Sequence, residues 1–180
     1  MKVLSEISNF GGSEIMQVRY PKFLAELKRL ISSVIISEKE FLYNPHELIG
    51  KFTREFQSLG YTKLKEEYGI QLPKSDSQMS GVFEQISFEK DKVLIEFLFD
   101  KVSSIFFDLL KFQALYSQSK AEVGIEIVAC HPLYKEMSSG VSYGEQLIYD
   151  IGRLKRHFPA VPVMIILIAP DNFDLSKVYV

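Results

Sequence analysis

The chain has 180 residues, of which 47% are apolar, with a net charge of −2 and a pI near 6.0. This size and composition suit one compact domain with a sizeable core, which we expect to span residues 1–180. The weak negative charge excludes a polycation that binds nucleic acid over its whole surface, so any DNA binding must come from a local basic cleft.

The sequence carries no sign of export or membrane insertion. Cys130 is the sole cysteine and cannot form an internal disulfide. Residues 1–12 lack the continuous apolar stretch of a secretory signal. The longest apolar run, residues 161–169, contains a proline and falls short of the roughly 20 residues that a membrane span needs. We therefore expect a cytoplasmic protein without a membrane segment.

Two amphipathic helices are predicted before the middle of the chain. Pro21 opens a stretch in which apolar residues recur at helical spacing as far as Val34. Asn44 and Pro45 then form a typical helix start, an N-cap followed by a first-turn proline, and the apolar period continues until Gly60.

An antiparallel hairpin is predicted next. Residues 70–81 show no period, and we interpret them as the loop that leads into the sheet. Residues 82–89 alternate between apolar and polar side chains, a turn fits residues 89–92, and the nearly all-apolar run 93–99 forms the second strand.

The rest of the chain alternates between helix and strand. A helical pattern over 105–116 precedes the apolar strand 123–129, and a helix around 147–154 precedes the apolar strand 161–169. Continuously apolar strands separated by helices indicate right-handed crossovers and a sheet covered on both faces. The predicted fold class is α/β, a mixed sheet in which an antiparallel hairpin is followed by a parallel βαβαβ unit.

Two carboxylates lie inside predicted apolar strands. Glu96 is the only charged residue in the run 93–99, and Glu126 is the only one in the run 123–129. A buried carboxylate is costly unless it is paired, hydrogen-bonded or bound to a metal. An acid that leans out at a sheet edge or pairs with a lysine would explain each one. A Mg²⁺ site would explain both, because Mg²⁺ accepts one or two carboxylates together with waters and phosphate.

Four blocks, spread over almost the whole chain, are similar to one protein family. They are residues 15–21, the hairpin segment 86–101, the block 135–143, which contains Glu-Met-Ser-Ser-Gly-Val-Ser-Tyr, and residues 159–170. The chain resembles the BglII/BstYI-type restriction endonucleases, a branch of the PD-(D/E)xK nucleases, with BstYI the nearest. The resemblance implies a restriction-endonuclease-like core, double-stranded DNA as partner and Mg²⁺ as cofactor. It also implies a homodimer that reads palindromic sites centred on GATC.

The catalytic hairpin departs from the family's pattern. In the family an Asp begins the hairpin, a Glu follows nine residues later, and a Gln comes two residues after the Glu. Glu96 matches the Glu, but Ser87 stands at the Asp position and Leu98 at the Gln position. The family's acids hold Mg²⁺, which stabilises charge on the phosphate and prepares a water for attack. Serine brings no charge to the ion and leucine cannot orient water, so we expect cleavage to be weak or lost.

A relocated acid would instead give a fully active endonuclease, which is the alternative. Glu126 on the neighbouring strand is one candidate. Glu89 and Asp91 share the face of Ser87 if the strand continues, although a solvated hairpin turn explains both more simply. Glu84 is a candidate only if that strand slips in register or carries a bulge.

The resemblance also suggests DNA-binding residues. Lys101 matches a family lysine at the end of the hairpin, where a cation would meet a phosphate or a base edge. A loop of small hydroxyls and a glycine corresponds to the region that reaches the major groove in the family, and it contains Ser138, Ser139, Gly140 and Ser142. Without the family, a solvated lysine and ordinary helix capping explain these residues. Further phosphate contacts could come from Lys135, Arg153, Lys155, Arg156 and His157.

Two questions stay open at the level of the sequence. Helices near residues 21–36 and 102–118 are both candidates for the dimer interface, and one sequence does not choose between them. A small-molecule α/β domain is a third functional hypothesis, which is disfavoured because no glycine-rich phosphate loop follows any strand.

Overall fold

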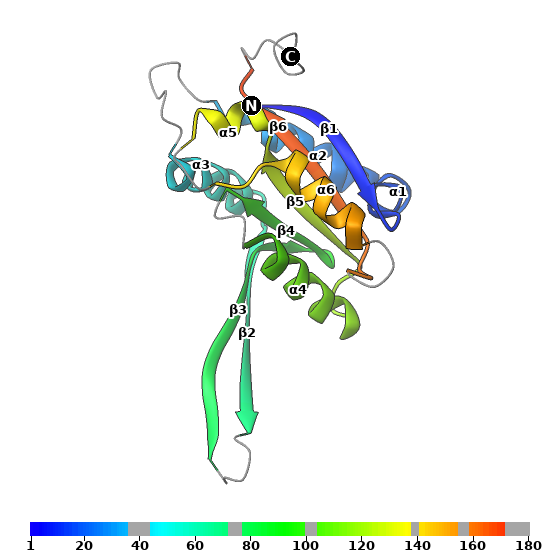
Figure 1. The fold of residues 1–180 in the computed structure, drawn as a ribbon, viewed down its shortest axis with the longest axis vertical. Helices are drawn as coiled ribbons and strands as arrows, with labels where there is room; N and C mark the ends of the chain where they lie inside the picture. Colours follow the sequence, from blue (N-terminus) through cyan, green and yellow to red (C-terminus); the bar gives the residue numbers. More distant parts are fainter. Residues whose placement is uncertain (36–43, 72–76, 100–103, 138–140, 155–158, 172–180) are drawn as a thin grey trace.

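The computed structural model describes residues 1–35, 44–71, 77–99, 104–137, 141–154 and 159–171. A six-stranded mixed sheet in the order β1-β6-β5-β4-β3-β2 forms its centre (Figure 1). The strands are β1 (Lys2–Asn9), β2 (Thr62–Gln71), β3 (Gln78–Lys90), β4 (Val93–Leu98), β5 (Val123–Ala129) and β6 (Val163–Ala169). Strands β4, β5 and β6 run parallel in the middle, and antiparallel pairs join β1 at one edge and β3 with β2 at the other.

Helices cover both faces of this sheet. They are α1 (Gly12–Arg19), α2 (Pro21–Ser33), α3 (Pro45–Ser58), α4 (Ser104–Ser117), α5 (His131–Lys135) and α6 (Gly144–Leu154). Helices α4 and α6 lie on one face, and α2 and α3 lie on the opposite face (Figure 1). Within the described ranges, no helix has both the length and the apolar character to cross a membrane.

The predicted local signals are found where the sequence placed them. Helix α2 begins at Pro21, and the side chain of Asn44 accepts a hydrogen bond of 3.0 Å from the backbone N–H of His46 at the start of α3. Asp91 and Lys92 turn the hairpin between β3 and β4 with φ values of 56° and 65°. Positive φ at both central residues suits the right-handed twist of a two-residue hairpin.

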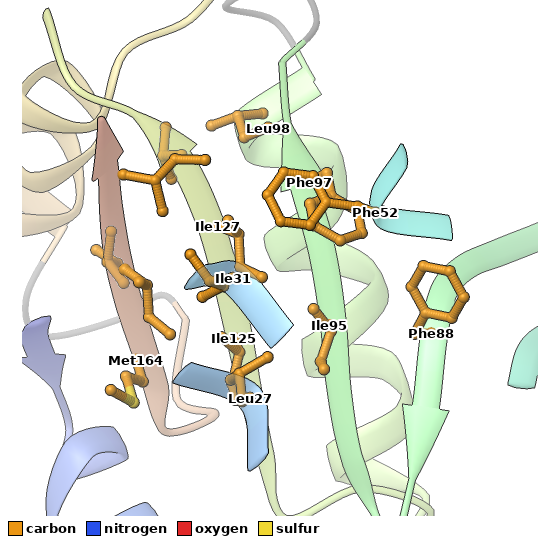
Figure 2. Close-up of a cluster of buried hydrophobic side chains, with 14 of the residues drawn as sticks. Leu27, Ile31, Phe52, Phe88, Ile95, Phe97, Leu98, Ile125, Ile127 and Met164 are labelled. Carbon is orange, nitrogen blue, oxygen red and sulfur yellow. The ribbon is translucent and has the colours of Figure 1, made fainter. Parts of the chain in front are cut away.

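The core fills the space between the sheet and the α2/α3 layer. Figure 2 shows Leu27 and Ile31 of α2 over β5, and the rings of Phe52 and Phe97 together between α3 and β4. The ring centroids of Phe52 and Phe97 are 4.9 Å apart and nearly parallel. Because side chains alternate along a strand, this orientation of Phe97 sends Glu96 to the other face of the sheet, beneath α4.

The α/β class and the hairpin are confirmed, but four elements were not predicted. The sequence interpretation lacked strand β1, helix α1, strand β2 and the short helix α5, and β3 begins at Gln78 rather than at residue 82. The predicted loop 70–81 therefore includes strand residues at both ends. Strands β2 and β3 form a long arm that projects from the body of the molecule (Figure 1). An arm held mainly by its backbone ladder needs no apolar alternation, which explains why the pattern gave no signal there.

Candidate active site

The two strand-borne acids meet on the sheet. Strands β4 and β5 are parallel, and Glu96 pairs in register with Glu126. Paired residues in neighbouring strands point to the same face, so both side chains lie under α4. Glu96 is 5% exposed and Glu126 is 1% exposed. The structure thus brings together the two carboxylates that the sequence singled out separately.

Ser87 and Leu98 share this face with Glu96. The Ser87 hydroxyl donates a hydrogen bond to Oε2 of Glu96 across the β3/β4 hairpin. Leu98 lies two residues beyond Glu96 on β4, opposite Val128, and is fully buried. The residues at the family's Asp, Glu and Gln positions are therefore neighbours, but the serine binds the glutamate directly and the leucine brings no polar atom.

Helix α4 adds a third acid and a cation. The Lys111 ammonium donates a hydrogen bond to Oε1 of Glu96 and lies 2.6 Å from Oδ1 of Asp108. Both α4 residues are buried, with exposures of 6% for Lys111 and 8% for Asp108. Ser87 and Lys111 together engage both carboxylate oxygens of Glu96.

Asp108 and Lys111 were missed by the sequence interpretation because α4 has apolar residues on two sides, one packed on the sheet and one exposed. Phe106 and Leu110, placed in the apolar pattern, are 41% and 53% exposed, whereas the two charged residues face the sheet. Gly124 on β5 admits the buried side of the helix, since a Cβ there would lie 2.3 Å from the Phe112 ring. An acid and a lysine three residues apart inside an apolar helix were the available signal.

Burial and neighbouring charges shift two groups of this cluster. Burial, followed by the negative charges of Asp108 and Glu96, raises the pKa of Glu126 well above its ordinary value. Among the described residues, neither carboxylate oxygen of Glu126 has a hydrogen-bond partner. Burial opposes the charge of Lys111, but Glu96 and Asp108 outweigh it, so the pKa of Lys111 lies above its ordinary value.

Glu126→Gln is expected to remove a pH dependence of stability. The folded protein keeps a proton on Glu126 where the unfolded chain, with a pKa near 4.5, loses it. The stability from this group is fully present below about pH 4.5 and is lost as the pH rises through the raised folded pKa. Because glutamine does not titrate, urea unfolding should show the variant more stable than wild type at pH 8, with a smaller difference at pH 5.

Glu136→Gln, at an exposed position after α5, is the control for the loss of one negative charge. It should change stability little at either pH, since surface substitutions have small effects. An effect of Glu126→Gln that is equal at pH 5 and pH 8 would contradict the raised pKa of Glu126.

The donor set fits a Mg²⁺ ion poorly in this arrangement. A metal on Glu96 would compete with Ser87 and Lys111, which engage its two oxygens, and would meet the positive charge of the ammonium. No group of three or more His, Cys, Asp or Glu residues is placed to hold a metal ion in the part of the chain that the structure describes. The carboxylates that suggested a Mg²⁺ site are therefore present, but a lysine already compensates the charge of Glu96.

Glu89 and Asp91, two of the acids proposed as replacements, do not join the cluster. Oε1 of Glu89 accepts a hydrogen bond of 3.3 Å from the N–H of Lys92 in the hairpin turn, and Asp91 is exposed. Both fit the solvated turn that the sequence favoured. Glu84 lies in β3 opposite Glu66, and its side chain lies outside the described part of the structure.

Most residues predicted to contact DNA lie outside the described residues. This holds for Lys101, Ser138, Ser139 and Gly140, and for Lys155, Arg156 and His157. Ser142 is described and fully buried. Lys135 and Arg153 are exposed, and the guanidinium of Arg153 lies 5.7 Å from the ring centroid of Tyr149. The DNA contacts of all these residues stay predictions.

Comparisons with known proteins agree with this fold. The family described as restriction endonuclease BglII/BglIII matches residues 5–168. The crystal structure of free BglII is similar with a TM-score of 0.68 and 16% identity, covering 95% of this chain and 81% of the other. The structure of restriction endonuclease BglII complexed with a DNA 16-mer gives a TM-score of 0.70 and 16% identity, covering 95% and 79%. No curated protein sequence matches the chain.

Proposed function

This chain belongs to the restriction endonuclease BglII/BglIII family, and we propose that it binds palindromic, GATC-centred duplex DNA while its Mg²⁺-dependent cleavage is weak or lost. One observation supports the proposal that cleavage is weak or lost. Both oxygens of Glu96 are engaged by groups of the protein itself, the Ser87 hydroxyl and the Lys111 ammonium. A metal ion at Glu96 would have to displace the ammonium without the aspartate that the family resemblance places at position 87.

The chemistry of phosphodiester hydrolysis explains why this arrangement is a poor catalyst. The reaction needs positive charge beside the phosphate and a water held for in-line attack. The positive charge of Lys111 is paired with the carboxylates of Glu96 and Asp108. Leu98 cannot orient a water, and Ser87 directs its hydroxyl at Glu96. The buried side chains thus pair with one another, and their charges are not directed at a phosphate of bound DNA.

The DNA-binding part of the proposal is supported by the family and by the fold shared with a structure solved as a DNA complex. We propose contacts from Lys101, Ser138, Ser139 and Gly140, because a lysine, small hydroxyls and backbone N–H groups suit phosphates and base edges. The fully buried Ser142 is left out of this proposal.

The exposed side of helix α4 supports a homodimer that pairs through this helix rather than through the candidate near residues 21–36. Its outward side carries Phe106, Phe107, Leu110 and Tyr116, with exposures of 41%, 58%, 53% and 38%. Large apolar side chains gathered on one exposed helix mark an interaction site. We propose that two copies pair through this face of α4, which would match the two-fold symmetry of a palindromic site.

A fully active endonuclease with a relocated acid is the second candidate. The observation that favours it is Glu126, whose unpartnered oxygens lie beside Glu96 on the neighbouring strand. If DNA binding moved Lys111 away, Glu96 and Glu126 would be two carboxylates for a Mg²⁺ ion, which accepts one or two together with waters and phosphate.

Duplex binding and cleavage are expected to separate in a direct assay. Labelled GATC-centred palindromes should be retarded in gels run without metal. Light scattering of the same complexes in solution should give a mass of two chains per duplex. Adding Mg²⁺ or Mn²⁺ should give little or no cleavage, from wild type and from Glu96→Gln alike.

Three results would each contradict one part of this proposal. Clear cleavage by the wild-type protein that Glu96→Gln abolishes would establish the active endonuclease with a relocated acid. Failure to bind every such duplex at low salt, where phosphate contacts are strongest, would remove the DNA-binding proposal. A mass of one chain per duplex would contradict the homodimer only.

A further inference from the structure

We propose that the outer side of helix α3, formed by Glu47, Gly50, Lys51 and Arg54, is a phosphate-binding surface for duplex DNA. The inference rests on the proposed function, because it adds a contact surface to a DNA-binding protein. It concerns two cations, Lys51 and Arg54, that were not among the residues predicted to contact DNA.

The four residues form one stripe along α3. They stand three and four positions apart, which places their side chains on the same side of a helix. The opposite side carries Leu48, Phe52 and Phe56, which are buried. The stripe lines a hollow of about 360 Å³. A Cβ at Gly50 would have nothing within 4 Å, so a phosphate can approach the helix backbone at this residue.

The stripe lies near the edge of the sheet where β4 ends. The ring of Phe52 stacks on that of Phe97 with centroids 4.9 Å apart, and it lies 6.1 Å from the ring of Phe99, just beyond β4. Figure 1 shows α3 beside the carboxyl end of this strand. Lys101, proposed above as a DNA contact, follows Phe99 by two residues. The two sets of cations therefore belong to the same end of the molecule.

A second set of contacts places Lys51 at this edge. Its ammonium donates a hydrogen bond of 3.4 Å to the carbonyl oxygen of Ile35, just beyond α2. The carbonyl of Val34 accepts a hydrogen bond from the amino group of Met1, and β1 then pairs at its start with Ala169, the last residue of β6. Because β4, β5 and β6 are parallel, their carboxyl ends lie along one edge of the sheet.

The charges of the stripe favour a phosphate backbone. Its two cations outnumber its one acid, Glu47. Arg54 is exposed, and among the described residues no carboxylate pairs with its guanidinium. Guanidinium and ammonium groups are the usual phosphate ligands of DNA-binding proteins. A duplex that meets Lys101 can therefore also meet α3.

Lys51→Gln combined with Arg54→Gln tests this surface through the salt dependence of binding to a labelled GATC-centred duplex. Each lost phosphate contact lowers the slope of log K against log salt by about 0.9, so the double variant should lower it by about 1.8 per chain. Fluorescence anisotropy at about 0.1 M salt should show binding weakened about tenfold or more. A duplex of scrambled sequence should lose the same factor, because phosphates carry no sequence information. Gly50→Leu, which fills the hollow without changing a charge, should also weaken binding.

Lys22→Gln combined with Arg29→Gln is the matched control, since it removes one exposed lysine and one exposed arginine from α2. It should change the affinity and the slope little, and all variants should melt close to wild type. An unchanged slope in the α3 double variant would overturn this inference and leave the DNA-binding proposal intact. Equal losses in the two double variants, or a loss confined to the GATC duplex, would also overturn it. A wild-type protein that binds no duplex at low salt would overturn the proposed function and this inference with it.

Discussion

Glu96→Ala is expected to lower the free energy of unfolding by about 3–5 kcal/mol, the usual cost of removing one partner from a buried ion pair. The change removes one of the carboxylates that pair with the Lys111 ammonium, and it removes the acceptor of the Ser87 hydroxyl. For a chain of this size the loss corresponds to a fall in melting temperature of roughly 6–20 °C. Urea unfolding at neutral pH measures the free energy, and thermal unfolding measures the temperature.

A surface ion pair supplies the matched control for this prediction. Glu6 pairs with Lys28 at 2.5 Å, and the two side chains are 22% and 40% exposed. Because exposed pairs contribute only about 0–1 kcal/mol, Glu6→Ala should change stability little. A double-mutant cycle between Glu96→Ala and Lys111→Met should give a coupling energy of about 1–3 kcal/mol. Equal, small losses for Glu6→Ala and Glu96→Ala would contradict the buried pairing.

Gly12→Ala is expected to destabilise the protein by about 3 kcal/mol or more, through overpacking at the start of α1. A Cβ on Gly12 would lie 2.2 Å from the carbonyl carbon of Val163 and 2.7 Å from the amide nitrogen of Met164. These are backbone atoms of β6, which cannot rotate away as a side chain can. Relief requires α1 to move off the sheet, and thermal unfolding should report the loss.

Gly50→Ala is the control for Gly12→Ala. A Cβ at Gly50 would have nothing within 4 Å, and the residue lies exposed inside α3. Alanine is favoured over glycine in a helix interior, so this variant should gain about 0.5–1 kcal/mol. A Gly12→Ala protein as stable as wild type would show that α1 does not pack against β6 at this distance.

The parts of the fold that the sequence predicted are those fixed by local chemistry. Asn44 and Pro45 specify the start of α3 through one hydrogen bond and one restricted φ, and neither depends on distant contacts. The hairpin at Asp91 and Lys92 is specified by the change from alternating to continuously apolar residues. The parallel strands followed from their apolar runs, since strands buried on both faces lose the alternation of a half-exposed sheet.

The candidate site could be predicted only in part, because its residues come from separate elements. The apolar strands marked Glu96 and Glu126, but their meeting depends on the register of β4 and β5, which neither strand specifies alone. Asp108 and Lys111 escaped prediction because α4 has two apolar sides, one packed on the sheet and one exposed. A helix of that kind gives no single stripe from which to choose its buried side.

The shared contacts of Glu96 make substitutions at Ser87 and Lys111 epistatic. An aspartate at position 87 would add negative charge beside carboxylates that have one ammonium among them, and it would hold Lys111 more firmly instead of freeing Glu96. Losing the lysine first would leave the buried acids without their compensating charge. Each single substitution towards the family's active site, at Ser87 or at Lys111, is therefore unfavourable by itself. A return to the family's residues would depend on the order in which these substitutions occur.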